Sequence, residues 1–230
     1  MQSVLSRLLQ SYRRDTSGAL APLFAIIGIS KLDIAGHSQS SMSGGFPVLD
    51  VAMCVDSTGS MQMSLDAVKS NALGFYNSIN NELRSRGIGE FPLMRVRMLY
   101  FRDFGDAIKG NWDLEPLRTS QFFALPDENS DFDAFVTPQY AYGGSDTPES
   151  GLECLNDAMS SNWLRPGDEA PGKNQTVTAS YPLIVIWTDA PTHPVAFANS
   201  LENPKYPPAT VMPRTMQGLL DKWNSDTVIP

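Results

Sequence analysis

The sequence of residues 48–61, VLDVAMCVDSTGSM, decides the fold of this chain. Residues 48–55 are almost continuously apolar, which is typical of a strand that is buried on both faces in a parallel sheet. The acidic residue Asp56 ends the run, and the hydroxyl side chains of Thr58 and Ser60 follow it. Because open parallel sheets place their sites at the carboxyl ends of strands, we expect a functional site in this loop.

A helix is expected directly after the loop, over residues 61–86. An apolar series recurs there at spacings of three and four, and it includes Leu65, Val68, Ile79 and Leu83. This spacing is the pattern of an amphipathic helix. A buried strand followed by such a helix is the unit from which α/β folds are built.

Further strands are predicted by short apolar runs at residues 94–101, 119–125 and 181–187. Shorter helices are expected at residues 131–136, 151–161, 195–201 and 216–223, and an exposed insertion rich in proline, glycine and asparagine at residues 164–179. The alternation of strands and helices predicts a Rossmann-like α/β fold, with a mostly parallel central sheet flanked by helices. The last residues, 227–230, would begin one more strand.

Two further loops carry oxygen-bearing side chains. Residues 143–149 have the sequence GGSDTPE, and residues 188–193, TDAPTH, follow the strand at 181–187. In a doubly wound sheet that strand neighbours the strand at 48–55, and the loop at 143–149 lies over both. Carboxylate and hydroxyl oxygens suit a hard divalent cation such as Mg²⁺. The three loops together therefore predict a cation site at this edge of the sheet.

These loops resemble the metal-ion-dependent adhesion site of von Willebrand factor A (vWA) domains, and the likeness extends over most of the chain, residues 46–225. It is closest to vWA domains with the loops Y-R-D-Y-G-D, G-G-G-D-T-P-E and T-D-A-P-P-H, and to the integrin β inserted domain with its D-x-P-E loop. The resemblance implies a vWA domain at residues 46–230. A complete vWA sheet has more strands than this sequence predicts, so we expect the domain to lack its last strands.

The resemblance also implies ligands for Mg²⁺ or Mn²⁺ in the first and third loops. Thr58 and Ser60 would bind the metal through their hydroxyls. Asp56 and Asp189 would act directly or through water.

The second loop offers two residues for one role. The likeness to the D-x-P-E loop favours Glu149 as a carboxylate ligand, and Thr147 is the alternative, as in collagen-binding vWA domains. The integrin β pattern also implies a second cation, Ca²⁺, held by Asp103, Asp146 and Glu149. In the alternative interpretation, Asp103 pairs with Arg102 or caps a turn.

Other interpretations of the first loop are weaker. The pattern Asp-x-Thr-x-Ser alone is also typical of a turn or a helix N-cap. The sequence has no G-x-x-x-x-G-K-[ST] phosphate loop and no recognisable Ser-His-Asp or Cys-His set, so we expect no enzyme activity. His193 is expected to orient the third loop. A metal-dependent hydrolase with Asp189 or Glu149 as general base is the remaining catalytic alternative.

Composition narrows the range of partners. The chain has 230 residues, a formal net charge of −8 and 42% apolar residues. An acidic chain of this kind is unsuited to the phosphate backbone of nucleic acids, and its apolar content predicts a packed core. The two cysteines, Cys54 and Cys154, are expected to be buried thiols and not a disulfide framework.

Residues 1–45 differ in character from the rest and are expected to form a leader and a polar linker. Arg13 and Arg14 precede an apolar run at residues 19–29, which is too short to span a bilayer and has the length of the apolar part of a signal peptide. This start resembles bacterial tight-adherence (Tad) pilus-assembly proteins of the TadG type. The resemblance implies a cell-envelope protein that is periplasmic, secreted or associated with the inner membrane through this segment.

The expected function is divalent-cation-dependent, adhesion-type binding of a protein. An open coordination position on the metal would capture an Asp or Glu side chain of the partner. The alternative is a structural pilus-assembly or surface component in which the metal stabilises the loops. Because the predicted sheet is short of strands, we also expect its open edge to pair with a partner or with a second copy of the chain.

Overall fold

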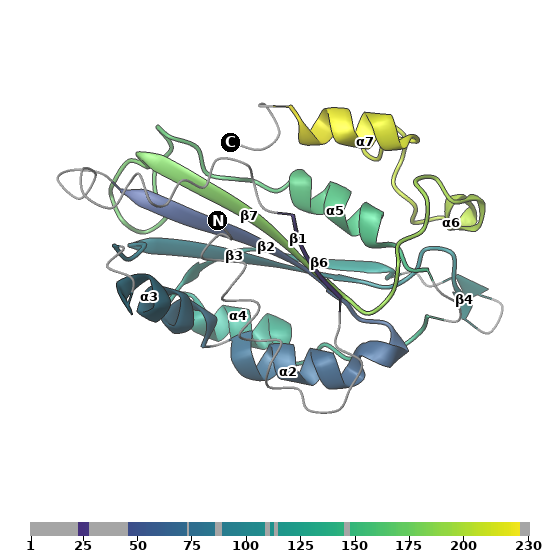
Figure 1. Cartoon of the computed structure of the whole chain (residues 1–230), viewed down its shortest axis with the longest axis horizontal. Coiled ribbons are helices and arrows are strands. Elements are labelled where there is room, and N and C mark those ends of the chain that lie inside the picture. The colour runs from purple at the N-terminus through teal and green to yellow at the C-terminus, as the bar shows by residue number, and fades with distance from the viewer. Residues whose placement is uncertain are drawn as a thin grey trace.

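The computed structural model describes residues 23–27, 46–72, 74–85, 89–108, 111–112, 115–144 and 148–225. These residues form three layers, in which helices cover both faces of one sheet (Figure 1). No helix within the described ranges is long and apolar enough to cross a membrane. The further strand predicted at residues 227–230 lies outside the described residues.

The main sheet has five strands in the order β1-β7-β2-β3-β6. Their bounds are Leu23–Ile27 (β1), Pro47–Asp56 (β2), Leu93–Phe101 (β3), Leu117–Leu125 (β6) and Ala179–Thr188 (β7). Strand β2 pairs in parallel with β3 and with β7, whereas β6 and β1 are antiparallel strands at the two edges. The strands predicted at residues 48–55, 94–101, 119–125 and 181–187 are confirmed, and so is the α/β fold with helices flanking a sheet that is parallel at its centre.

Strand β1 is not among the strands that the sequence predicts, because its residues fall in the expected leader. It runs antiparallel along β7, from Leu23 opposite Thr188 to Ile27 opposite Ile184. The edge of β7 that the sequence leaves open is therefore paired within this chain. The physical reason is that an unpaired strand edge presents a row of free N–H and C=O groups, which any nearby extended segment can satisfy.

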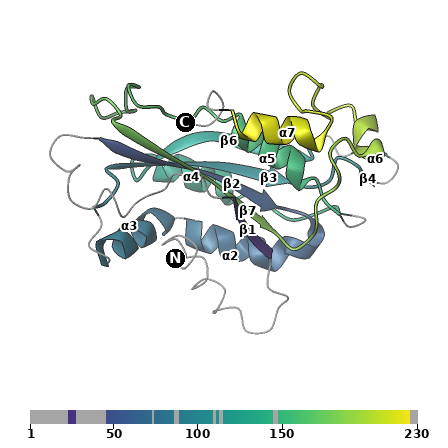
Figure 2. The ribbon, with the colours of Figure 1, turned by 45° about the horizontal axis from the view of Figure 1, so that its top comes forward.

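Helices lie on both faces of the sheet, as Figure 2 shows from a tilted view. Alternate residues of β2 pack against opposite layers of these helices. Val51, Met53 and Val55 pack in one cluster with α2, α3 and α4, whereas Ala52 and Cys54 pack in a second cluster with α5 and α7. The helix bounds are Gln62–Ala72 (α2), Phe75–Ser85 (α3), Asn129–Val136 (α4), Gly151–Met159 (α5), Ala198–Glu202 (α6) and Met216–Trp223 (α7). Burial on both faces explains why the sequence of β2 is almost continuously apolar.

The single helix expected over residues 61–86 is interrupted. A short 3-10 turn, η1 (Gly59–Met61), leads into α2, and α3 begins just after Gly74. Glycine inside a helix costs about 1 kcal/mol relative to alanine, so the break falls where the helix is weakest. Leu65 of α2 and Leu83 of α3 are both buried against the sheet, so each half still turns its apolar side inward.

The insertion at residues 164–179 is predicted to be exposed, and this prediction is wrong for part of it. Leu164, Ala170 and Val177 are buried in a third cluster, together with Val48 at the start of β2. They cover the amino end of the parallel strands, opposite the predicted site. A small hairpin of β4 (Ala107–Ile108) and β5 (Asn111–Trp112) is a further element that the sequence does not predict.

The two cysteines are free thiols, as predicted. Cys54 on β2 and Cys154 on α5 are both fully buried. Burial raises the pKa of the Cys154 thiol well above its usual range. Because the thiolate is the reactive form, this thiol is chemically inert at neutral pH in the folded chain.

Candidate metal centre

The three oxygen-bearing loops meet at the carboxyl ends of β2 and β7. The Gly59 N–H donates a hydrogen bond to the Gly143 carbonyl oxygen at 3.0 Å, which joins the first loop to the second. The Glu149 N–H donates to the Pro191 carbonyl oxygen at 2.9 Å, which joins the second loop to the third. Backbone hydrogen bonds therefore fix the three loops relative to one another.

A chain of neighbouring oxygens runs from the third loop to the first. Ser60 Oγ donates to Asp189 Oδ1 at 3.2 Å and lies 3.5 Å from Thr58 Oγ1. Thr58 Oγ1 donates to Asp56 Oδ1 at 2.7 Å, and Thr188 Oγ1 donates to Asp56 Oδ2 at 2.7 Å. The structure brings Asp56, Thr58, Ser60 and Asp189 together in this chain of contacts. Thr188, the last residue of β7, also belongs to this set. The resemblance to vWA domains assigns it no role.

Asp56 is a buried carboxylate whose described contacts are all with neutral groups. Its side chain is 0% exposed, and no ion pair to it occurs in the part of the chain that the structure describes. Burial raises the pKa of Asp56, the hydrogen bonds from Thr58 and Thr188 partly offset this rise, and the nearby charge of Asp189 adds to it. The carboxylate is therefore in an environment that a bound cation would relieve.

The side chains of the oxygen chain are buried at the end of Asp56 and exposed at the end of Asp189. Asp56 and Thr58 are buried, whereas Ser60 and Asp189 are exposed. One side of the cluster is therefore closed by protein and the other faces solvent. A cation held among these oxygens would be accessible to a ligand from the side of Ser60 and Asp189.

Glu149 approaches the same point from the second loop. Its side chain is 3% exposed. Gly144 separates it from Thr58, because a Cβ atom added to Gly144 would lie 2.9 Å from Glu149 Oε1 and 2.8 Å from the Thr58 Cβ. Gly144 also has a φ of +74°, which side chains other than glycine rarely adopt. The role of this glycine is not predicted from the sequence, although the Gly143-Gly144 pair before the acidic stretch is a signal of a close backbone approach.

The second predicted ligand of this loop, Thr147, lies outside the described residues, as does Asp146 of the predicted second cation site. The choice of Glu149 over Thr147 therefore remains a prediction. Asp103, the remaining member of the second site, is 1% exposed. Its Oδ1 accepts hydrogen bonds from the Gly105 N–H at 2.8 Å and from Ser150 Oγ at 2.9 Å. These contacts agree with the alternative interpretation, in which Asp103 caps a turn.

His193 occupies the position expected of a residue that orients the third loop. Its Nε2 lies 3.3 Å from Asp103 Oδ2, and its ring stacks on Phe197 with 4.1 Å between centroids. Its backbone N–H donates to the Glu149 carbonyl oxygen at 2.8 Å. The side chain is 2% exposed, so the ring is fixed on several sides.

The donor set fits a hard cation only if hydroxyl oxygens take part. Among the residues that the structure describes, no group of three or more His, Cys, Asp or Glu side chains is close enough to hold a metal ion. Asp56 and Asp189 provide carboxylates, and Thr58 and Ser60 provide hydroxyls between them. Mg²⁺ accepts such a set, because it binds through one or two carboxylates and completes its shell with water or ligand oxygens.

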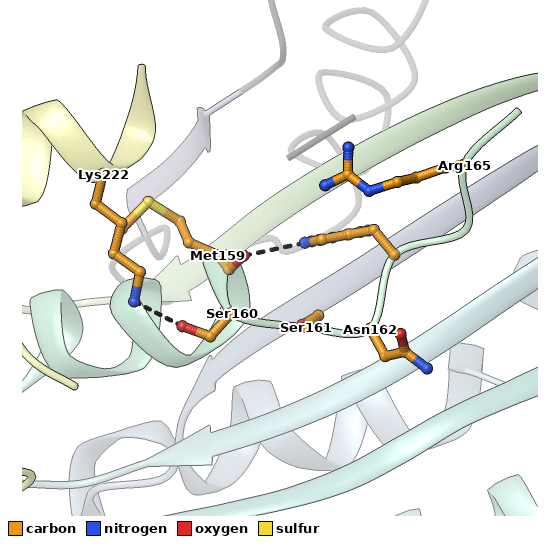
Figure 3. Close-up of a pocket in the computed structure, with 7 residues that line it drawn as sticks. Met159, Ser160, Ser161, Asn162, Arg165 and Lys222 are labelled. Carbon is orange, nitrogen blue, oxygen red and sulfur yellow. Dashed lines mark hydrogen bonds between the residues drawn. The ribbon is translucent and has the colours of Figure 1, made fainter. Parts of the chain in front are cut away.

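A separate cavity of about 360 Å³ lies at the carboxyl end of α5, beside α7 (Figure 3). Lys222 points into it and donates hydrogen bonds to Ser160 Oγ at 2.6 Å and to Asn156 Oδ1 at 2.7 Å. Burial lowers the pKa of Lys222. These contacts attach α7 to α5, and the lysine is already engaged by oxygens of the protein itself. The cavity has no carboxylate among its lining residues, so it differs in chemistry from the oxygen chain.

No protein-family model matches the chain, and no curated protein matches it. Two solved structures of the pilus adhesin SpaC from Lactobacillus rhamnosus GG are similar to part of it. The structure in an open conformation has 17% identity and a TM-score of 0.34, and the match covers 50% of this chain and 12% of the adhesin. A second structure of that adhesin has 16% identity and a TM-score of 0.35, and the match covers 58% of this chain and 14% of the adhesin. The chain therefore corresponds to a small part of the adhesin's length.

Proposed function

We propose that this chain is a divalent-cation-dependent protein-binding module of the vWA type. Mg²⁺ or Mn²⁺ would be held by Asp56, Thr58, Ser60 and Asp189, with Glu149 from the second loop. An acidic side chain of a partner protein would complete the shell of the metal. The role is binding and not catalysis, and the cell envelope is the proposed location.

The observation that carries this proposal is the environment of Asp56. A fully buried carboxylate is costly without a partner charge, yet Asp56 is surrounded by the hydroxyls of Thr58 and Thr188 and by the acidic Asp189. A divalent cation would stabilise the charged form of Asp56 and remove its repulsion with Asp189. Asp56 Oδ1 also accepts a hydrogen bond from the Thr58 N–H at 2.9 Å, which is the contact of the turn alternative. The helix-cap alternative has no such contact, because no side-chain capping bond is made at the start of η1.

The hydroxyl content of the set explains why an external carboxylate would bind. Hydroxyl ligands carry no formal charge, so a divalent cation held by few carboxylates keeps part of its positive charge. That charge attracts an anionic ligand more strongly at a partly desolvated site than in bulk water. The exposed position of Ser60 and Asp189 leaves the approach to the metal open on one side.

The first experiment is a calorimetric titration of the full chain with MgCl₂ and MnCl₂. We expect saturable binding to the wild type and none to the double variant Asp56→Asn/Ser60→Ala, because the variant removes a charge and a hydroxyl from the oxygen chain. The matched control is Asp131→Asn, which removes an exposed carboxylate from α4 and should leave the metal affinity unchanged. A folded wild type that binds neither metal at millimolar concentration would overturn the proposal.

A second measurement distinguishes the structural alternative from this proposal. In a structural pilus-assembly or surface component, the metal would only hold the loops together. Glu149→Ala would then lower the melting temperature and leave partner binding intact at low temperature. In the binding module, the same variant weakens metal affinity and metal-dependent binding of an acidic ligand together.

A further inference from the structure

The two most exposed large apolar side chains of the described residues both adjoin the candidate metal centre. Met63 is 78% exposed and Tyr140 is 60% exposed. The next values in this group are those of Val211 and Met216 at 50% and 48%, near and on α7. Single exposed apolar residues are common on protein surfaces, but these two are placed at the same loop junction.

One hydrogen bond connects the segments that carry the two side chains. Gln62 Oε1 accepts from the Ala141 N–H at 3.0 Å, and Met63 and Tyr140 are the sequence neighbours of these two residues. Met63 also follows Ser60 by three positions at the start of the helical segment. Residues three apart lie on the same side of a helix, so Met63 lies on the side of the exposed metal ligand.

Tyr140 belongs to an aromatic stack. Its ring is 5.1 Å from that of Tyr142, at an interplanar angle of 27°, and the Arg102 guanidinium lies 3.9 Å from the centroid of the Tyr142 ring. The Tyr142 N–H donates to the Ser57 carbonyl oxygen at 3.0 Å. The exposed ring of Tyr140 is thus connected, through Tyr142, to the first loop of the candidate metal centre. Such preorganised aromatic side chains contribute strongly to protein interfaces, because little conformational freedom is lost when they bind.

We propose that Met63 and Tyr140 are specificity-determining contacts for the segment of the partner that carries the acidic residue. The inference rests on the proposed function and deepens it. The ligand would be an extended peptide segment in which an Asp or Glu binds the metal and the neighbouring side chains are apolar or aromatic. The ring of Tyr140 takes one neighbour, and the flexible thioether of Met63, which adapts to irregular surfaces, takes the other.

The test uses labelled peptides and the full chain in MgCl₂. One peptide carries a single Asp between phenylalanine and leucine, a second carries the Asp between two serines, and a third replaces the Asp of the first peptide by Asn. We expect the apolar-flanked Asp peptide to bind about tenfold or more tightly than the serine-flanked one, and the Asn peptide not to bind. Fluorescence anisotropy gives the dissociation constants.

The variants Met63→Ser and Tyr140→Ser should weaken binding of the apolar-flanked peptide by about tenfold each and leave the calorimetric Mg²⁺ affinity unchanged. The control Leu220→Ser removes a side chain that is 46% exposed on α7, and it should change neither value. If Mg²⁺ does not bind to the wild type, the proposed function fails. If Mg²⁺ and both Asp peptides bind equally well, only this inference is overturned. One further result would also overturn the inference. The chain would bind a free hexose in a metal-dependent way that Tyr140→Ser abolishes, and it would bind no peptide.

Discussion

Asp50 and Asp56 lie on the same strand, β2, and both are 0% exposed, yet their surroundings are opposite in charge. Arg95 donates to both carboxylate oxygens of Asp50, from Nε at 2.8 Å and from Nη2 at 2.5 Å. The Leu164 N–H adds a third bond at 2.9 Å. Within the described residues, Asp56 accepts bonds from hydroxyls and from one backbone N–H only.

The difference separates a structural carboxylate from one that is available to a ligand. The charge of Asp50 is neutralised by a side chain of the same sheet, and its bonds to Arg95 and Leu164 attach β2 to β3 and to the insertion. No cationic side chain among the described residues forms an ion pair with Asp56. Of these two buried carboxylates, Asp50 alone has a cationic partner among the described residues.

The largest expected effect comes from breaking the Asp50 pair. Arg95→Met leaves Asp50 buried without its cation, so we expect the free energy of unfolding to fall by about 3–5 kcal/mol. Urea denaturation followed by circular dichroism measures it. The double variant Asp50→Leu/Arg95→Met removes both charges and should recover much of the loss. A loss below about 1 kcal/mol for the single variant would show that Asp50 and Asp56 do not differ in this way.

The second largest expected effect is the gain in stability when a metal ion binds at Asp56. At a free Mg²⁺ concentration one hundred times the dissociation constant, the wild type should gain about 2.7 kcal/mol of stability. Asp56→Asn should lose that gain and be at least as stable as the wild type without metal, because the amide carries no buried charge. Melting curves with MgCl₂ and with EDTA measure both quantities. A variant that still gains stability from Mg²⁺ would place the metal elsewhere.

Gly144 offers a sharper test of how closely the loops approach. Gly144→Ala places a methyl group against Thr58 and Glu149 in a left-handed backbone conformation. Gly172→Ala is the matched control, because its φ is +68° and nothing lies within 4 Å of the added atom. Left-handed φ alone costs roughly 1–2 kcal/mol, so the control gives that value. We expect Gly144→Ala to lose more stability than the control and also to lose Mg²⁺ binding. Equal losses and intact binding would contradict the packing of the second loop against the first.

Glu153 is another buried carboxylate, and its titration extends the comparison to the pH dependence of stability. Burial raises its pKa, and the hydrogen bond from Tyr206 partly offsets this rise; the charges of His193 and Asp103 also act on it. The folded chain therefore keeps the proton at pH values where the unfolded chain has released it. Stability is lost as pH rises from the ordinary value of 4.5 through the raised pKa. Glu153→Gln should flatten this decline by on the order of 1 kcal/mol, measured by denaturation between pH 4 and pH 8. An unchanged pH profile would show that Glu153 is not the titrating group.

Most of the central sheet follows from the sequence because its signal is local. The apolar runs of β2, β3, β6 and β7 are long enough to identify strands without knowledge of their neighbours. Strand β1 is missed because its pairing with β7 depends on the folded sheet and not on its own pattern. The buried part of the insertion, such as Val177, is missed for the same reason, since its loop composition conceals a tertiary contact.

The candidate metal centre, like the sheet, could be predicted from the sequence only in part. The oxygen ligands of the first and third loops follow from motif spacing and from the position of sites in parallel sheets, and the structure brings Asp56, Thr58, Ser60 and Asp189 together. Gly144 and Thr188 are missed, because their roles arise from contacts between loops that are distant in sequence. Metal binding itself, the identity of the metal and its ligand in the second loop remain predictions.

The hydrogen bond from Thr188 to Asp56 spans 132 residues of sequence, and this has a consequence for biosynthesis. Ribosomes add about 5–20 residues per second, so a nascent chain holds Asp56 for roughly 7 to 26 seconds before Thr188 and Asp189 are made. During that interval β2 also lacks its neighbour β7. Under the proposed function, cation uptake then follows translation of the last central strand, and a product that ends before residue 188 would not show metal-dependent binding.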